Sequence, residues 1–438
     1  MQANRTPLSN DNIRQIFGRY QAKSLAKKIG ASQRKDRKFS VVDIIISYWQ
    51  LLSVGEFSYD KWATQISILT NKSISGQAVW KRIGPEMVEL IKQLLQKSFK
   101  QKYDTLIDSA LFQFFPNVYI QDATHFGLPR SLSSIFPGSY SKFGKAATAK
   151  IQAVFNIRRG IFSGFELASF RDNDQKDANR ITKNLKEKDL VIRDLGYFVL
   201  KVFSNIAKQR AFFLSRFRFG VIVFDKETIK PLDLQKLLKK KKGIVDIHVK
   251  LGREEKLNCR LVAVPVPEDV ANKRKRKAKK DRSKKANHSK EYLNLLGYTI
   301  YITNVSQDIW SIEQIEKAYR SRWYIEILFK GWKSNLNMKI TIPKRYINQQ
   351  RVEFFFYASL LMVNLLVIPI FFRAQKCGIK KKQYISILKT CAYISQNMGL
   401  FINSKKWNYL IEHIHYSCMY ESRNDRINSI AHLVDFTP

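Results

Sequence analysis

The first 110 residues carry apolar side chains at spacings of three and four, the pattern of helices that bury one face. This pattern predicts helices at residues 11–28, 41–54, 59–69 and 85–100. A polar turn and a short segment beginning at Ser75 separate the last two, and that segment carries Lys81 and Arg82. A helix, a turn and a Ser-capped helix resemble a helix-turn-helix, in which Lys81 and Arg82 would contact DNA. An ordinary helical hairpin with its basic residues in water gives the same pattern.

Beyond residue 117 the apolar spacing changes to that of β-strands. Strands are predicted at residues 117–121, 150–158, 162–169, 190–194 and 219–224. Helices are predicted at residues 177–188 and 197–209. Strands and helices in this order are typical of a mixed α/β layer.

Residues 225–305 interrupt this layer. Strand-like stretches lie at 244–249, 257–266 and 298–305, with runs of charge between them at 239–242 and 272–290. The second run has eleven Lys or Arg residues and a single acid, so it cannot form a core and predicts a flexible loop. We expect this loop to grip a phosphate backbone. A nuclear-targeting signal or a plain solvated insertion are the alternatives.

The C-terminal third returns to helical spacing. Helices are predicted at residues 314–335, 351–375, 380–398 and 405–420. The stretch 354–372 is long enough to cross a membrane. It contains Asn364 and Pro369 and is flanked by arginines, so we predict a buried helix instead. Apolar residues from Tyr384 to Ile411 predict either a dimer contact or a cover for the core.

The helix predicted at 314–335 has a narrow polar stripe on an otherwise apolar surface. At about 100° per residue, Tyr319, Arg322, Glu326 and Lys333 fall within roughly 60° of one another, with Lys330 beside them. Such a stripe predicts a helix whose charged side faces a polar cleft. The alternative is a simple Arg322–Glu326 pair on a packed helix.

The composition indicates which partner the chain binds. Lys and Arg outnumber Asp and Glu by 77 to 36, a net charge of +41, and nucleic acid is the usual partner of a chain this basic. The apolar share of 45% excludes a wholly disordered chain. Four separated cysteines indicate neither a zinc site nor a disulfide framework. With no apolar signal segment or lipidation motif, we expect a cytoplasmic, nucleoid-associated protein without a membrane partner.

Three acids are candidates for one site. Asp122 and Asp194 each end a predicted strand, and Glu326 lies on the striped helix. Carboxylates at strand ends project toward the sheet edge where sites form. Three such ligands suit Mg²⁺ or Mn²⁺, and two ions about 3.5–4 Å apart can promote an in-line displacement at phosphorus. A single Asp at a strand end is more often a turn or cap residue.

The spacing Tyr319-x2-Arg322-x3-Glu326-x6-Lys333 resembles the YREK signature of the insertion-sequence-4 family of bacterial DDE transposases. Asp194-Leu-Gly-Tyr-Phe198 is similar to the family's second-Asp region. Asp122-Ala-Thr124 is similar, more loosely, to its first-Asp region. The resemblance covers about residues 115 to 340 well.

The resemblance implies an RNase H-like mixed-sheet α/β core with a β-rich insertion and helical ends. The predicted domains are a helical DNA-binding domain, the core in two parts separated by a basic insertion, and a helical C-terminal region. The DNA-binding domain comprises residues 1–112, and the core comprises 113–224 and 306–375. The basic insertion comprises 225–305, and the C-terminal region comprises 376–438.

The resemblance also implies metal-dependent cut-and-paste transposition through a hairpin at the transposon end. Asp122, Asp194 and Glu326 would bind two Mg²⁺ or Mn²⁺ ions. Tyr319, Arg322 and Lys333, with Lys330 beside them, would contact phosphates near the cut end. The DNA partners would be inverted-repeat transposon ends and target DNA, bridged by a homodimer. Similar proteins clamp a flipped base in the insertion, and Trp310 is the nearby tryptophan.

Two other functions fit the same residues. One is a catalytically inactive DNA-binding protein derived from a transposase, which the intact acid triad disfavours. The other is an RNase H-like nuclease that cuts without joining, which the YREK stripe disfavours.

Overall fold

The computed structural model describes residues 13–32, 38–101, 110–141, 144–282, 287–338, 342–343, 345–379, 383–403 and 407–421. The chain divides into two compact units. Unit 1 comprises Met1–Ser109, Asp122–Asp172 and Trp323–Pro438, and unit 2 comprises Ala110–Gln121 and Asn173–Arg322.

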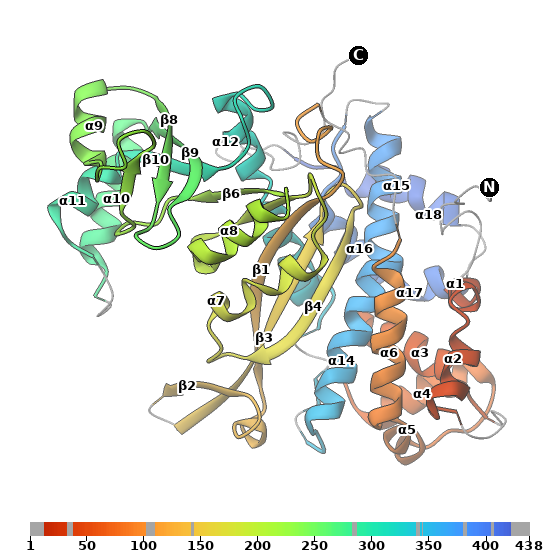
Figure 1. Cartoon of the computed structure of the whole chain (residues 1–438). Coiled ribbons are helices and arrows are strands. Elements are labelled where there is room, and N and C mark those ends of the chain that lie inside the picture. Colours follow the sequence, from red (N-terminus) through yellow and green to blue (C-terminus); the bar gives the residue numbers. More distant parts are fainter. Residues whose placement is uncertain are drawn as a thin grey trace. The chain divides into compact units, whose positions relative to one another are not determined.

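The N-terminal part of unit 1 is helical, as predicted (Figure 1). Its helices are α1 (Ile13–Arg19), α2 (Ala22–Ile29), α3 (Val41–Val54), α4 (Tyr59–Thr70), α5 (Gly76–Arg82) and α6 (Pro85–Ser98). Ser40, Ser58 and Ser75 cap α3, α4 and α5 by accepting hydrogen bonds from backbone N–H groups. The single helix predicted at 11–28 is wrong, because a left-handed turn at Gln21 separates α1 from α2.

The long apolar helix forms the centre of unit 1. It runs as α14 (Gln349–Met362), a π-helical segment (Val363–Val367) and α15 (Ile368–Ile379). In the described part of the chain, Gln349–Gly378 is the one helix long and apolar enough to cross a membrane, and its most apolar window is entirely buried. Asn364, on the π turn, donates to the Phe162 carbonyl and to Ser98 Oγ. The prediction of a buried helix is confirmed.

The C-terminal helices cover this centre. They are α16 (Ile387–Gln396), α17 (Met398–Asn403) and α18 (Trp407–Ser417). Most of the apolar residues considered for a dimer contact are buried within the chain, including Ile394, Trp407 and Ile411, whereas Tyr409 is exposed. The structure therefore favours their role as a cover of unit 1. Tyr409 and Tyr416 stay exposed on α18, and the dimer contact stays a prediction.

Unit 1 also contains a small sheet. Its strands are the second half of β1 (Val118–Leu128), β2 (Pro137–Ser141), β3 (Gly144–Asn156) and β4 (Ile161–Ser169). β3 neighbours β1, β2 and β4, and it forms with β4 the hairpin predicted around Gly160, which has a φ of 61°. Phe126 of β1 packs on Phe356 of α14 at a ring distance of 5.0 Å, so the sheet lies on the central helix.

Unit 2 holds the rest of the sheet, in the order β1–β5–β6–β10–β9–β8–β7. Its strands after β1 are β5 (Leu190–Arg193), β6 (Phe212–Arg216), β7 (Val223–Asp225), β8 (Val245–Leu251), β9 (Leu257–Pro265) and β10 (Tyr298–Thr303). β1, β5 and β6 are parallel. The strands of the predicted insertion extend the same sheet, with β10 antiparallel to β6 and each further strand antiparallel to its neighbour. The predicted fold class, a mixed α/β sheet with helical ends, is confirmed.

The helices of unit 2 are α7 (Asp174–Asp177), α8 (Leu200–Lys208), α9 (Leu234–Lys241), α10 (Glu268–Lys280), α11 (Lys290–Leu295) and α12 (Ile312–Arg320). The helix predicted at 177–188 is wrong, because α7 and a 3₁₀ turn at Arg180–Asn184 occupy this region. Only the end of the strand predicted at 219–224 is extended, and β6 lacked a predicted strand.

The basic run 272–290 is another correction, because most of its described part is helical rather than a loop. α10 begins with Glu268 and Asp269 and ends with several lysines, so its charges complement the helix dipole at both ends. Arg274 donates from Nη1 to the Tyr298 carbonyl at 3.3 Å, which attaches α10 to β10. Residues 283–286 of the run lie outside the described residues.

The striped helix is not continuous. α12 ends at Arg320, α13 (Trp323–Lys330) follows a turn, and a π-helical segment (Gly331–Asn335) follows α13. The regular wheel drawn over residues 314–335 is therefore wrong in detail, because the turn and the π segment each change the angle between neighbouring side chains.

Candidate active site

Two predicted acids and two predicted lysines meet in one cavity of unit 1. The cavity has a volume of about 420 Å³ and is lined by Asp122, Ala123, Thr124, Glu326, Phe329, Lys330, Lys333 and Ser334. Carboxylates and ammonium groups around one polar space can hold a cation and a phosphate group side by side.

Asp122 stands where the pairing of β1 with β5 ends. The parallel pairing of β1 with β5 ends at Gln121, opposite Arg193, but β1 itself continues to Leu128 beside β3. The prediction that Asp122 ends a strand is therefore wrong, although it does follow the last residue paired with β5. The backbone N–H of Ala123 donates to Asp122 Oδ1 at 2.8 Å.

Glu326 is positioned by the apolar face of α13. Ile325, Leu328 and Phe329 are buried, and α13 packs against α16. Glu326 itself is half-buried and faces the cavity. Because the residues of α13 around Glu326 are buried, the position of the Glu326 carboxylate is fixed by the packing of the helix.

Lys333 reaches the same cavity from the π segment. Its Nζ lies 5.2 Å from the centre of the Phe126 ring, within reach of a cation–π contact. Trp332 Nε1 donates to Ser359 Oγ at 3.0 Å and fixes the segment on α14. A Cβ at Gly331 would come within 2.9 Å of Cys391 Sγ, so the segment depends on glycine to approach α16 this closely.

The third acid and the first two residues of the YREK signature lie in unit 2. Asp194 directly follows β5, and Tyr319 and Arg322 are each 8% exposed. Burial raises the pKa of Tyr319, with Arg322 opposing the rise and Asp194 adding to it. These three residues are therefore near one another in unit 2. The Tyr319 hydroxyl is buried without a hydrogen-bond partner, and its ring packs on Tyr301 at 5.3 Å.

The structure does not gather the whole triad within one unit. Asp122 and Glu326 belong to unit 1 and Asp194 belongs to unit 2. Across the residues that the structure describes, there is no group of three or more His, Cys, Asp or Glu side chains that could hold a metal ion.

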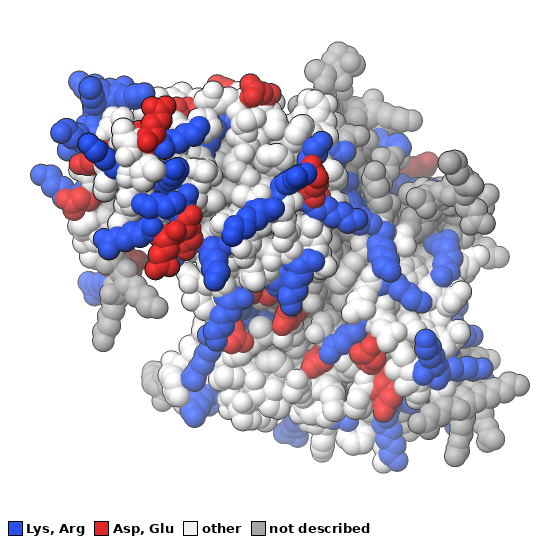
Figure 2. Space-filling view, viewed as in Figure 1, with Lys and Arg blue, Asp and Glu red and all other residues white. Residues whose placement is uncertain are grey.

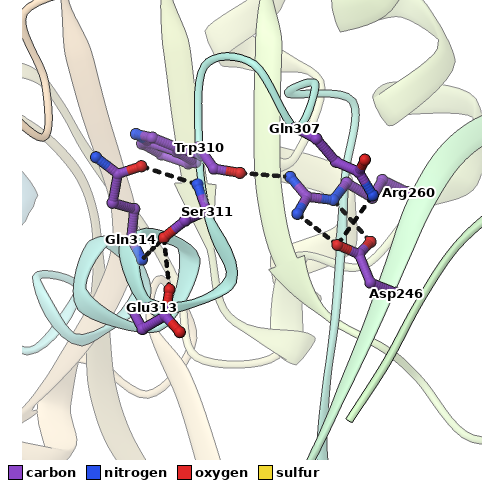
Figure 3. A network of polar contacts seen from close by, with 7 residues as sticks. All are labelled: Asp246, Arg260, Gln307, Trp310, Ser311, Glu313 and Gln314. Carbon is purple, nitrogen blue, oxygen red and sulfur yellow. Dashed lines mark hydrogen bonds and ion pairs between the residues drawn. The ribbon is translucent and has the colours of Figure 1, made fainter.

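A buried network that the sequence did not reveal anchors the start of α12 (Figure 3). Arg260 of β9 binds both carboxylate oxygens of Asp246 at 2.8 and 2.6 Å and donates to the Trp310 carbonyl at 2.7 Å. The next residue, Ser311, forms a capping box with Gln314. Nothing local in the sequence marks Arg260 and Asp246, since they lie on different strands.

Trp310 is a core residue in this network. It is 1% exposed, its Nε1 donates to the Leu111 carbonyl at 2.8 Å, and its ring packs on Phe115 at 5.0 Å. A side chain enclosed in this way has no face free to stack on a base, so the structure gives no support to a base clamp at Trp310.

The family model described as "Transposase DDE domain" matches residues 113–365, more than half of the chain. The chain belongs to this transposase family. The match begins just before β1 and ends in the π segment of the central helix, so it includes Asp122, Asp194 and Glu326.

Curated relatives of this transposase extend over most of its length. The transposase for insertion sequence element IS231D of Bacillus thuringiensis subsp. finitimus is 29% identical, over 88% of this chain and 84% of the relative. The transposase for insertion sequence element IS1151 of Clostridium perfringens is 26% identical, over 81% and 78%. The predicted resemblance to bacterial insertion-sequence transposases is confirmed.

The solved structures give a weaker likeness. A cryo-EM structure of the piggyBac transposase synaptic complex with hairpin DNA aligns with a TM-score of 0.39 and 9% identity, over 92% of this chain and 82% of that chain. At that TM-score the likeness carries no argument, so the family rests on the sequence matches.

The transposase carries further basic groups outside the cavity. Lys and Arg side chains gather over the part of unit 2 that holds α9, α10 and α11 (Figure 2). On α5 of unit 1, Lys81 is exposed, whereas Arg82 donates to the Ala31 carbonyl and its guanidinium lies 5.3 Å from the Phe39 ring. Of the two candidate DNA contacts on α5, Lys81 is the more available.

Proposed function

We propose that this transposase carries out metal-dependent cut-and-paste transposition of an insertion sequence, with Asp122, Asp194 and Glu326 as its acidic triad. The observation that carries the proposal is the unit 1 cavity, in which Asp122 and Glu326 face Lys330 and Lys333 in a chain of the DDE family.

The strand register supports Asp194 as the third acid. Gln121 pairs with Arg193; Asp122 is the next residue of β1, and Asp194 directly follows β5 with an extended backbone. Because successive side chains of a strand point to opposite faces, Asp122 and Asp194 leave their strands on the face opposite Gln121 and Arg193.

The carboxylates fit a hard divalent cation. Asp122 and Glu326 supply oxygen ligands in a polar cavity, the donor type that Mg²⁺ and Mn²⁺ prefer. One or two such ions, when bound, would stabilise charge that develops on the phosphate oxygens. The acids of this chain would hold and orient the ions.

The cations of the site would bind the DNA. Lys330 and Lys333 border the carboxylates and would hold the phosphate groups beside the cut. Arg322 would do the same from unit 2. Tyr319 can reach a phosphate only if its hydroxyl, buried here, becomes exposed. The net charge of +41 supplies the sequence-independent part of binding.

The transposase would act on inverted-repeat ends and target DNA, as expected of a protein whose relatives are named for insertion sequences. Cutting two ends before joining them requires two active sites, so the productive form would be a homodimer on DNA. A hairpin at the transposon end remains part of the proposal.

The test is a nicking assay on duplexes that carry the terminal repeats of the element, with Mg²⁺. Asp122→Asn, Asp194→Asn and Glu326→Gln should each abolish nicking while gel-shift affinity stays near that of the wild type, since affinity comes mainly from Lys and Arg. Asp308→Asn, at an exposed carboxylate of unit 2, is the control that should nick normally.

Each outcome bears on a different part of the proposal. A nicking-competent Asp194→Asn enzyme would remove Asp194 from the site. A wild type that binds without nicking would be the inactive DNA-binding protein, and one that nicks but never joins its product to target DNA would be a nuclease.

A further inference from the structure

A second, larger cavity of unit 1 shares no lining residue with the proposed active site. Its volume is about 1030 Å³. It is bordered by the loop after α3, the first turns of α4 and α5, and the segment that precedes α14. The lining residues are Gly55, Glu56, Phe57, Ser58, Tyr59, Asp60, Lys61, Gly76, Gln77, Trp80, Ile342, Pro343, Arg345 and Tyr346.

The aromatic walls of this cavity are held in place from behind. Phe57 packs edge-on against Phe355 of the central helix at 5.1 Å and against Tyr59 at 5.3 Å. Tyr59 stacks on the fully buried Trp62 at 6.3 Å. Rings fixed in this way present rigid planar surfaces, at little entropic cost to a ligand that stacks on them.

Tyr346 also lines the cavity and is 77% exposed. Its φ is 53°, in the left-handed region that bulky residues rarely adopt. Arg351 donates from Nη1 to its carbonyl at 3.3 Å, and the same guanidinium lies 4.3 Å from the centre of the Trp80 ring. A large exposed aromatic ring on a strained backbone that is held by a hydrogen bond is more typical of a binding site than of the rest of a protein surface.

Polar groups of the cavity suit the edge of a heterocycle. The Tyr59 hydroxyl is buried with no hydrogen-bond partner, and burial raises its pKa to about 12, so it is a proton donor at neutral pH. Gln77 is exposed at the first turn of α5 and can both donate and accept. The charged residues of the lining balance, because Lys61, paired with Glu56, and Arg345 stand against Glu56 and Asp60.

We propose that this cavity binds an unstacked nucleobase of the transposase's DNA, with Tyr346 and Trp80 as stacking surfaces. The inference rests on the proposed function for its DNA partner. A base has the flat face that these rings match and the polar edge that Tyr59 and Gln77 match, and its phosphate suits a chain with a charge of +41.

The test compares two probes with equal phosphate charge: a single-stranded oligothymidylate of about ten nucleotides and a fully abasic oligomer of the same length. Full-length Tyr346→Ala should bind the oligothymidylate about 5- to 140-fold more weakly than the wild type. This range is the 1–3 kcal/mol of one base–aromatic stack, converted at 1.4 kcal/mol per tenfold. Binding of the abasic oligomer should not change, because it offers no base to stack.

Two variants control this comparison. Tyr346→Phe keeps the ring and should bind as the wild type. Tyr409→Ala removes a tyrosine of similar exposure, 64%, from α18 and should have no effect. Unfolding curves that match the wild type will show that Tyr346→Ala is folded.

Two results would overturn the inference. One is an unchanged affinity of Tyr346→Ala for oligothymidylate, which is the result expected of a protein-binding surface. The other is an equal loss for the abasic oligomer, which would indicate a phosphate contact. Glu326→Gln should keep the preference for bases. A wild type that never nicks would contradict the proposed function, yet a base preference that depends on Tyr346 would still uphold the cavity.

Discussion

Replacing Arg260 by methionine should destabilise unit 2 strongly, because the change leaves a buried carboxylate and a buried carbonyl without their donor. The Arg260 side chain is 2% exposed and that of Asp246 is 14% exposed. Breaking a buried ion pair by removing one partner costs about 3–5 kcal/mol. Gln307 still donates to Asp246 at 3.2 Å, so the lower half of that range is expected.

The loss converts to a measurable shift in melting temperature. Unit 2 has about 160 residues, and 1 kcal/mol moves the Tm of a domain of that size by about 2–4 °C. A cost of about 3–4 kcal/mol therefore lowers its Tm by about 6–16 °C. The assay is thermal unfolding of the full-length protein followed by circular dichroism, with hydrogen exchange of the α12 amides to assign the effect to this network.

Two further variants separate charge from packing. Arg253→Met, at an exposed arginine between β8 and β9, should stay within about 0.5 kcal/mol of the wild type. The double variant Arg260→Met with Asp246→Leu should recover most of the loss, because no charge remains buried alone. The reasoning is refuted if the double variant is as unstable as the single one, since the cost would then come from packing.

Three other predictions follow from the structure. Replacing four exposed cations of α10 by Gln should lower the slope of log K against log salt for DNA by about 3.6, measured by gel shift at several salt concentrations; an unchanged slope would make α10 a bystander. The four are Lys273, Arg276, Lys277 and Lys280. Asp43→Asn should cost about 1–2 kcal/mol at neutral pH, and its difference from the wild type should vanish in acid unfolding curves. Burial raises the pKa of Asp43, but hydrogen bonds from Ser40 and the Arg14 guanidinium outweigh burial and hold this pKa below its usual range. The stability that Asp43 contributes is therefore present above about pH 4 and is lost as the pH falls through the folded pKa. Gly331→Ala should lower the free energy of unfolding by about 1–3 kcal/mol and slow nicking, because its Cβ would clash with Cys391 Sγ. Adding Cys391→Ala to this variant should restore both stability and nicking. A double variant that stays as impaired as the single one would show that this clash is not the cause.

The sequence predicted what depends on local spacing. The N-terminal helices, the β3–β4 hairpin and the buried central helix follow from apolar periods within single segments. Glu326, Lys330 and Lys333 lie within eight residues of one another, so a helical spacing was enough to group them, and the structure brings them to one cavity.

The rest depends on partners that no local pattern reveals. α10 was mistaken for a loop because its charges dominate its composition, whereas the attachment of Arg274 to β10 is a long-range contact. The Arg260–Asp246 pair joins two strands, and the aromatic cavity combines residues 55–80 with 342–346. Such contacts are set by the folded topology, since the residues that meet are far apart in the chain.

Two local irregularities bring the charged groups of the active-site cavity together. The pairing of β1 with β5 ends where Asp122 stands although β1 continues to Leu128, and the helix after Glu326 widens to a π turn where Lys333 stands. Departures from regular structure that coincide with functional side chains are expected where a site constrains the fold. The close approach of Gly331 to Cys391 is the packing that holds the second irregularity in place, and through it α16 helps to fix the position of Lys333.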